Sequence, residues 1–311
     1  MTFHNHPDWP YPGARWWKFD FHTHTPASKD TPWNYLVGRQ GEELTPEQWL
    51  QRYMDAGIDC VAITDHNSGI WIDRLKEAYE EMRAAGAPGF CEMHIFPGIE
   101  ISVNGGFHLL ALFDKDKTTA DIDALCGAVG YDGTDGDSDG VTRKSPVEVI
   151  QAALDADGIP IPAHADGAKG LLCVQDDDPA KAALDANTLR QIFACRDILA
   201  LEVVDRARQK PVVYTELGIS LSEVIGSDCP NFRNGNLPGS RYTWVKMATP
   251  SLEGLRLALM DGEGFSIRRS DDPKPFDPSG LPEHFIDPSL HFFPPRGGES
   301  LISASFQPNS A

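Results

Sequence analysis

The chain has 311 residues, 41% of them hydrophobic, which fits one catalytic domain of about 250 residues with additional tails. Its 46 acidic and 27 basic residues give a formal net charge of -19, which disfavours extended binding to a nucleic-acid backbone. The N-terminus lacks a secretion signal, no apolar stretch could span a membrane, and the six cysteines show no pairing pattern. We therefore expect a cytoplasmic protein without a membrane partner.

A His-x-His pair follows a Pro- and Trp-rich leader at residues 1–16. It closes the alternating run Phe19-Asp20-Phe21-His22-Thr23-His24, which predicts a β-strand. Alternate side chains share one face of a strand, so His22 and His24 can bind one metal ion. Taken alone, such a pair is as often a solvent-facing strand edge as a metal site.

A helix is expected over residues 45–56, and five further apolar runs follow. Each run ends at or encloses a side chain that can bind a metal: 60–63 with His66, 95–99 with Glu100, 107–113 with His108, 159–163 with His164, and 224–227 with Asp228. Surface histidines and carboxylates have no reason to prefer strand ends, whereas barrel and open α/β enzymes place their active groups there. The alternative for His108 is a satisfied core histidine.

The ligand types indicate which ions fit. Imidazole and carboxylate together suit zinc, manganese or iron, and the absence of a paired-cysteine motif argues against a closed structural zinc site. We therefore expect bound divalent ions, which would activate water.

The ordered motifs His-x-His, Thr-Asp-His, Gly-x-Glu, a strand His, His-Ala-Asp and Gly-Ser-Asp resemble the PHP family of metal-dependent phosphoesterases. The resemblance covers residues from about Trp17 to Ile267 and implies a distorted (β/α)7 barrel with metals at the carboxyl ends of its strands. It implies one metal held by His22, His24, Glu100 and Asp228, a second by Asp30 and His66, and a third by Glu100, His108 and His164.

The chain departs from the family at Pro230, where a second ligand histidine is usual. Water, Cys229 and Asn231 are the candidates to complete the second metal site. The sequence around His22 and His66, together with the run 250–259, looks most like the PHP module of TrlF-like PHP-AAA ATPases. No P-loop motif is present, so an ATPase would be a partner or a missing domain.

Four polar residues near the motifs have expected roles or open alternatives. Asp65 is expected to orient a metal-bound imidazole. Asp166 either does the same for His164 or is a turn residue. Lys169 is favoured over Arg206 as a ligand for substrate phosphate, although either could be a solvated surface charge.

Residues 17–269 are expected to form the catalytic domain, and 270–311 a Pro-rich extension. The Gly- and Asp-rich segment 114–144 is expected to be a flexible loop that covers the site.

The resulting prediction is a metal-dependent phosphoesterase acting on a nucleotide or a nucleic-acid end, as a nuclease or phosphatase. The alternatives are a small-metabolite phosphatase and a catalytically degenerate metal-binding module that partners an ATPase.

Overall fold

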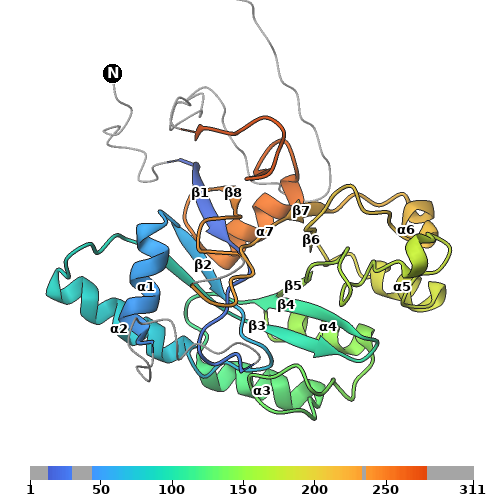
Figure 1. Ribbon diagram of the computed structural model, residues 1–311, viewed down its shortest axis with the longest axis horizontal. Helices are drawn as coiled ribbons and strands as arrows, with labels where there is room; N and C mark the ends of the chain where they lie inside the picture. The colour runs from blue at the N-terminus through green and yellow to red at the C-terminus, as the bar shows by residue number, and fades with distance from the viewer. Residues whose placement is uncertain (1–12, 30–43, 233–235, 279–311) are drawn as a thin grey trace, which may run out of the picture.

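The computed structural model describes residues 13–29, 44–232 and 236–278. They form a mixed α/β fold whose main sheet curls into a half-barrel (Figure 1). In chain order the elements are β1 (Arg15–Asp20), α1 (Pro46–Asp55), β2 (Cys60–Ile63), α2 (Ile72–Ala85), β3 (His94–Val103), β4 (Phe107–Leu112), α3 (Thr119–Val129), α4 (Pro146–Asp155), β5 (Ile159–Pro162), a 3-10 turn (Gln175–Asp177), α5 (Ala186–Phe193), β6 (Ala200–Glu202), α6 (Val212–Leu217), β7 (Ser222–Val224), β8 (Thr243–Met247), α7 (Leu252–Asp261) and β9 (Ile267–Arg269).

The main sheet has the order β5-β4-β3-β2-β1-β8-β9, and β6 and β7 form a separate parallel pair. Strands β1, β2 and β3 are parallel neighbours, whereas β4, β5, β8 and β9 join antiparallel. The expected barrel-like α/β fold is therefore present, but a regular (β/α)7 order is not confirmed.

Both faces of the sheet are buried, as the near-continuous apolar strands predict. In β2, Val61 and Ile63 belong to a core cluster shared with helices α1 to α6, while Cys60 and Ala62 belong to a second cluster that includes residues of α7. The helices pack in pairs, with α1 and α2 together and α5 and α6 at the other end of the molecule (Figure 1). This double burial fixes the strands whose ends carry the site.

Helix α1 forms as predicted because its ends are capped. The Thr45 side chain accepts a hydrogen bond from the Gln48 backbone nitrogen, the Gln48 side-chain oxygen accepts one from the Thr45 backbone nitrogen, and Pro46 starts the first turn. Its buried face includes Trp49, whose Nε1 donates to the carbonyl of His24 at 2.9 Å. Helix α1 therefore supports the backbone of the His-x-His segment directly.

Three expectations about individual elements need correction. The segment 114–144 is not one loop, because Ile122, Leu125 and Val129 bury one face of helix α3. Glu100 lies inside β3, since pairing with β4 continues to Val103. His22 and His24 follow the end of β1 rather than lie within it.

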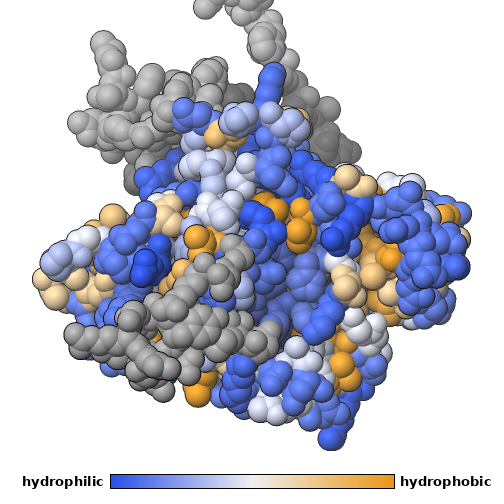
Figure 2. Space-filling model, viewed as in Figure 1, coloured by the Kyte–Doolittle hydropathy of each residue, from blue (hydrophilic) through white to orange (hydrophobic). Residues whose placement is uncertain are grey.

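Among the described residues, no helix combines the length and apolarity needed to cross a membrane. The face in Figure 2 is mostly hydrophilic, with its hydrophobic residues in small separated areas.

Candidate metal centre

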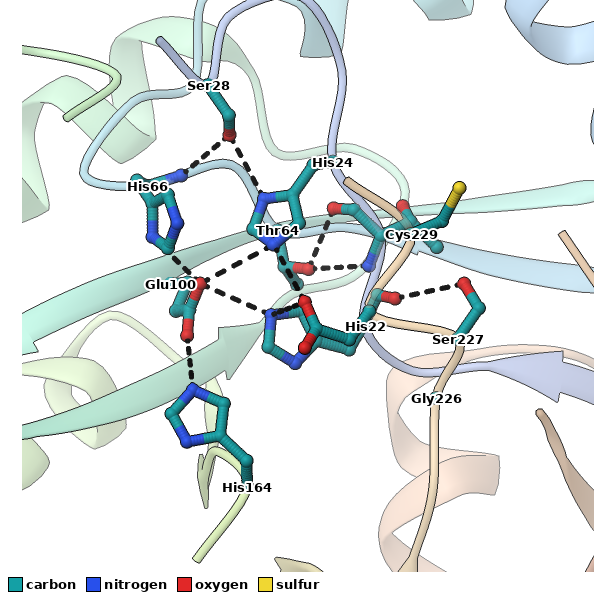
Figure 3. Close-up of polar contacts among 12 residues, drawn as sticks. His22, His24, Ser28, Thr64, His66, Glu100, His164, Gly226, Ser227 and Cys229 are labelled. Atoms are coloured by element: carbon teal, nitrogen blue, oxygen red, sulfur yellow. Dashed lines mark hydrogen bonds and ion pairs between the residues drawn. The ribbon is translucent and has the colours of Figure 1, made fainter. Parts of the chain in front are cut away.

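Seven of the eight predicted metal ligands come together in one largely buried cluster. Figure 3 labels His22, His24, His66, Glu100 and His164 among them. They reach it from the ends of β1, β2, β5 and β7 and from inside β3 and β4. The cluster consists of His22, His24, His66, Glu100, His108, His164 and Asp228. The eighth, Asp30, lies outside the described residues.

Glu100 is the centre of this cluster, and its two carboxylate oxygens face different histidines. Oε2 lies 3.2 Å from Nε2 of His22 and 2.8 Å from Nδ1 of His66. Oε1 lies 2.7 Å from Nδ1 of His108 and 3.1 Å from Nε2 of His164. Each oxygen of Glu100 therefore faces a different pair of imidazoles.

Three groups of ligand atoms are each close enough to hold one ion. They are His22, His24 and Asp228; His24, His66 and Glu100; and Glu100, His108 and His164, with all ligand atoms of a group within 4.8 Å of one another. Nitrogen and oxygen ligands at about 2.0–2.2 Å from a tetrahedral ion lie roughly 3.4 Å apart. The distances from Asp228 Oδ1 to Nε2 of His22 and His24, 3.8 and 3.3 Å, are compatible with that spacing.

The two histidines of the His-x-His pair each have a partner for Nδ1 outside the group of ligand atoms. Nδ1 of His22 lies 2.8 Å from a carboxylate oxygen of Glu202, which can only accept, so Nδ1 donates there and Nε2 is the atom available to a metal. Nδ1 of His24 lies 3.0 Å from Oγ of Ser28, which itself donates to Asp65 at 2.8 Å. The Nε2 atoms of both rings therefore face the carboxylates of the cluster.

Glu202 is a site residue that the sequence prediction did not include. Its side chain is 1% exposed; Oε2 also accepts from the backbone nitrogen of His164 at 2.9 Å, and Oε1 from that of Gly226 at 3.2 Å. The available signal was a glutamate flanked by apolar residues within the short run 201–203, where a buried carboxylate requires partners.

The electrostatics of the cluster keep its carboxylates ionised. Burial raises the pKa of Glu100, but the imidazoles of His66, His22 and His108 hold it well below its usual value. Burial also raises the pKa of Asp228, but His22 and His24 lower it to about 2. The charged carboxylates in turn hold the pKa of His22 well above its usual value, despite the opposing effect of burial. Divalent cations would take over the role of these positive charges.

Backbone strain gathers at the same place. His164, with φ of 28°, and Asp228, with φ of 47°, are in the left-handed region, as is Asn67, which directly follows His66. Non-glycine residues adopt this region at a cost, and such residues concentrate at functional sites. The surrounding hydrogen bonds of Glu202 and Asn67 hold these conformations.

Asp65 and Asp166 anchor loops around the site. Asp65 accepts from the backbone nitrogen of Thr25 at 2.7 Å and reaches His24 through Ser28. Asp166 accepts from the backbone nitrogens of Val204 and Asp205, which ties the His164 loop to the exit of β6. The geometry thus favours the turn-residue alternative for Asp166.

The two predicted phosphate-binding cations differ in their surroundings. Lys169 lies at the site, since its carbonyl accepts from the backbone nitrogen of His108 at 3.0 Å and its Nζ donates to Ser138 at 3.1 Å. Arg206 is instead held by Glu223, Glu263 and Asp272 at 2.9, 2.7 and 2.6 Å. These three partners of Arg206 all lie outside the metal cluster.

Of the candidates to replace the histidine absent at position 230, Cys229 does not fit. Its thiol donates to the carbonyl of Asn231, and burial raises its pKa to about 12, which disfavours the thiolate that binds metals. Figure 3 shows its sulfur directed away from Glu100.

The residues present fit a group of divalent ions. Nε2 of His22 and Oε2 of Glu100 are buried, and neither forms a hydrogen bond with any described residue. Buried polar atoms without hydrogen bonds are costly, and a shared cation is the simplest common partner for an imidazole nitrogen and a carboxylate oxygen 3.2 Å apart.

No protein-family model and no curated protein matches this chain. Among solved structures, the lesion-specific endonuclease Endonuclease Q from Pyrococcus furiosus is similar, with a TM-score of 0.53 and 14% identity over 81% of this chain and 57% of that one. Endonuclease Q bound to duplex DNA with an abasic lesion gives a TM-score of 0.51, at 14% identity over 81% of this chain and 58% of that one. A protein described as a metal-dependent phosphoesterase, from Bifidobacterium adolescentis, gives 0.44 at 20% identity, over 78% of this chain and 96% of that one.

The likeness to Endonuclease Q concerns the fold, and the chain spans a little over half of that enzyme's length. It supports the barrel-like α/β fold expected from the sequence. The finer resemblance to TrlF-like PHP-AAA ATPases is not confirmed by these comparisons.

Proposed function

We propose that the protein is a metal-dependent phosphoesterase that hydrolyses a phosphoester of a nucleotide or a nucleic-acid end. The observation that carries this proposal is the central position of Glu100, whose two oxygens face two groups of imidazoles. Bound divalent ions at such a centre supply hydroxide near neutral pH and neutralise charge on phosphoryl oxygens. Zinc, manganese and iron suit this donor set.

The residues of the chain divide this work. His22, His24 and Asp228 would hold one ion, and Glu100, His108 and His164 another. The group of His24, His66 and Glu100 offers a third position, to which Asp30 would add a ligand. Glu202, Ser28 and Asp65 orient the imidazoles through their second nitrogen or through the backbone.

The open side of the cluster lies at Asp228 and His164. Their side chains are 37% and 19% exposed, whereas Glu100 is 1% exposed. A substrate phosphate would enter there, next to Lys169 and to Arg208, whose guanidinium donates to the carbonyl of Asp166 at 3.1 Å. Arg208 thereby takes the place that Arg206 had in the sequence prediction.

A degenerate binding module that partners an ATPase is the competing function, and Pro230 is the observation in its favour. Against it stands the completeness of the remaining ligand set, since a decaying site is expected to lose more than one ligand. A small-metabolite phosphatase differs from the main proposal only in the substrate.

The test is hydrolysis of a phosphoester panel by purified protein with and without added manganese. The panel comprises a bis-aryl phosphate, mononucleotides, nucleoside bisphosphates and end-labelled DNA. We expect metal-dependent hydrolysis that His24→Ala and Asp228→Ala each abolish, together with a loss of bound metal in both variants. Retained metal without hydrolysis of any substrate would favour the binding module instead.

A further inference from the structure

Residues 131–142, here called the acidic loop, form one wall of the metal centre. At its tip, the carbonyl of Gly136 accepts from the backbone nitrogen of Lys29 at 2.6 Å, and that of Asp137 from Nδ2 of Asn67 at 2.9 Å. Ser138 accepts from Lys169 at 3.1 Å. Lys29 and Asn67 lie in the segments that carry His24 and His66, and Lys169 is the backbone partner of His108. The loop therefore lies against the ligand-bearing segments themselves.

The contact at the tip is too close for any residue but glycine. A Cβ built at Gly136 would overlap the carbonyl oxygen of Ala27, and the φ of Gly136 is 85°. The loop thus approaches the His-x-His segment as closely as backbone can.

Internal hydrogen bonds hold the acidic loop in one shape. The hydroxyl of Tyr131 donates to the carbonyl of Asp137 at 2.7 Å, the backbone nitrogen of Thr134 to Asp139 at 2.8 Å, and that of Val141 to Asp132 at 3.1 Å. At its end, the backbone nitrogen of Thr142 donates to the carbonyl of Ser102 on β3 at 3.0 Å. The loop is a built wall of the site rather than a loose connection.

The charge of this wall has one sign. The loop contains Asp132, Asp135, Asp137 and Asp139 and no lysine or arginine, and Asp132, Asp135 and Asp139 are exposed. Exposed charges act over a Debye length of about 8 Å at physiological salt. A single terminal phosphate at the metal centre leaves few phosphates within that distance of the wall, whereas a polynucleotide running past the site would bring several.

We propose that the acidic loop determines substrate length: the enzyme accepts a phosphoester of mononucleotide size and rejects polynucleotide chains by repulsion from this wall. This inference rests on the proposed phosphoesterase function and narrows its substrate class. Endonuclease Q has the same fold and acts on duplex DNA, so the fold itself does not impose the restriction.

The experiment compares kcat/KM for two substrates in three proteins. The substrates are the p-nitrophenyl ester of thymidine 5'-monophosphate and a single-stranded oligonucleotide of about 20 nucleotides, longer than the roughly 4–16 that a single-strand site covers. The proteins are the wild type, Asp135→Lys, and Glu81→Lys. Asp135 takes no part in the loop's internal bonds described above, and Glu81 is an exposed residue on α2.

We expect Asp135→Lys to raise the ratio of oligonucleotide to ester kcat/KM by about tenfold at low salt, with the gain shrinking as salt is added. The ester activity and Glu81→Lys should stay near the wild type. An unchanged ratio, or an equal rise in Glu81→Lys, overturns the role of the loop while leaving the phosphoesterase intact. If the wild type hydrolyses neither substrate, the proposed function fails and this inference with it.

Discussion

A single glutamate connects five imidazoles in this protein, and the side chains around it decide how each imidazole points. Glu100 faces His66, His22 and His108 closely enough that their charges lower its pKa despite burial. Glu202 lies behind His22 and binds the backbone of His164 as well. The orientation of His22 and of the His164 segment therefore depends on the buried carboxylate of Glu202.

Glu202→Gln tests that dependence at the scale of one residue. An amide cannot accept from both Nδ1 of His22 and the backbone of His164 as strongly as a carboxylate, so metal affinity should fall by about 10- to 100-fold. Competition of the protein with a coloured chelator measures the affinity. Glu223→Gln is the matched control, because Glu223 on β7 pairs with Arg206 and Lys210 outside the cluster.

Asp20 makes the metal-free protein sensitive to pH. Burial raises its pKa to about 7, and its Oδ2 forms no hydrogen bond within the described chain. A carboxyl whose pKa is higher in the folded than in the unfolded state supports folding at a pH below its unfolded pKa. This contribution to stability is lost as the pH rises towards its folded pKa. Between pH 5 and pH 7, the free energy of unfolding of the metal-free protein should therefore fall by about 2 kcal/mol less in Asp20→Asn than in the wild type.

Urea denaturation of the chelator-treated wild type and the Asp20→Asn variant at both pH values measures this difference. Parallel pH profiles for the two proteins would show that Asp20 ionises in the folded state much as it does in the unfolded state.

At the scale of elements, the close approach of two strand ends shapes the site. Gly226 follows β7, and a Cβ there would overlap the backbone nitrogen of His22 and lie 2.8 Å from its Cβ. Gly226→Ala should therefore displace His22 and lower metal occupancy, with a destabilisation of about 1–3 kcal/mol from overpacking. Metal content after gel filtration and the urea midpoint report the two effects.

Gly127 on α3 supplies the matched glycine control. A Cβ at Gly127 would meet nothing within 4 Å, and alanine is the better helix former by about 1 kcal/mol. Gly127→Ala should leave metal binding unchanged and stabilise the fold slightly. An equal loss of metal in both variants would contradict a specific role of the close contact between Gly226 and His22.

The elements near the site were predictable to different degrees. Short buried strands such as β2 and β5 were predictable, because their apolar runs are bounded by turn residues and polar ligands. Helix α3 was not, since its Gly and Asp content resembles a loop and only its packing reveals the apolar face. The antiparallel course of β8 and β9 depends on pairing between distant segments, which local patterns do not encode.

The candidate ligands themselves were largely predictable, because histidines and carboxylates at successive strand ends form an ordered motif. Their partners were not: Glu202 and Ser28 matter through contacts with residues 180 and 4 positions away. Arg206 was misleading for the same reason, since Glu263 and Asp272 approach it only in the folded chain.

At the scale of the whole molecule, the metal centre links the two ends of the described domain. It joins residues after β1 to Asp228 near the C-terminal strands. Because only the folded chain brings these ligands together, bound ions stabilise the folded state relative to the unfolded state. A metal whose free concentration is about 100 times its Kd adds about 2.7 kcal/mol to the free energy of unfolding. Removal of metal should therefore lower Tm by about 5 °C or more in a domain of this size.

Differential scanning calorimetry before and after chelation measures this shift, and readdition of manganese should reverse it. In Asp228→Ala the shift should shrink. An identical Tm with and without metal would mean that the cluster is not a site of tight binding.

The proposed function requires that this cluster binds divalent ions and that phosphoester hydrolysis depends on them. The most direct measurement is stepwise return of manganese to chelated protein, with bound metal and hydrolysis of a bis-aryl phosphate recorded at each step. The account predicts no hydrolysis without metal and a rate that rises with occupancy of at least two sites. Full hydrolysis by the metal-free protein, or full occupancy without hydrolysis of this ester or of the wider panel, would contradict it.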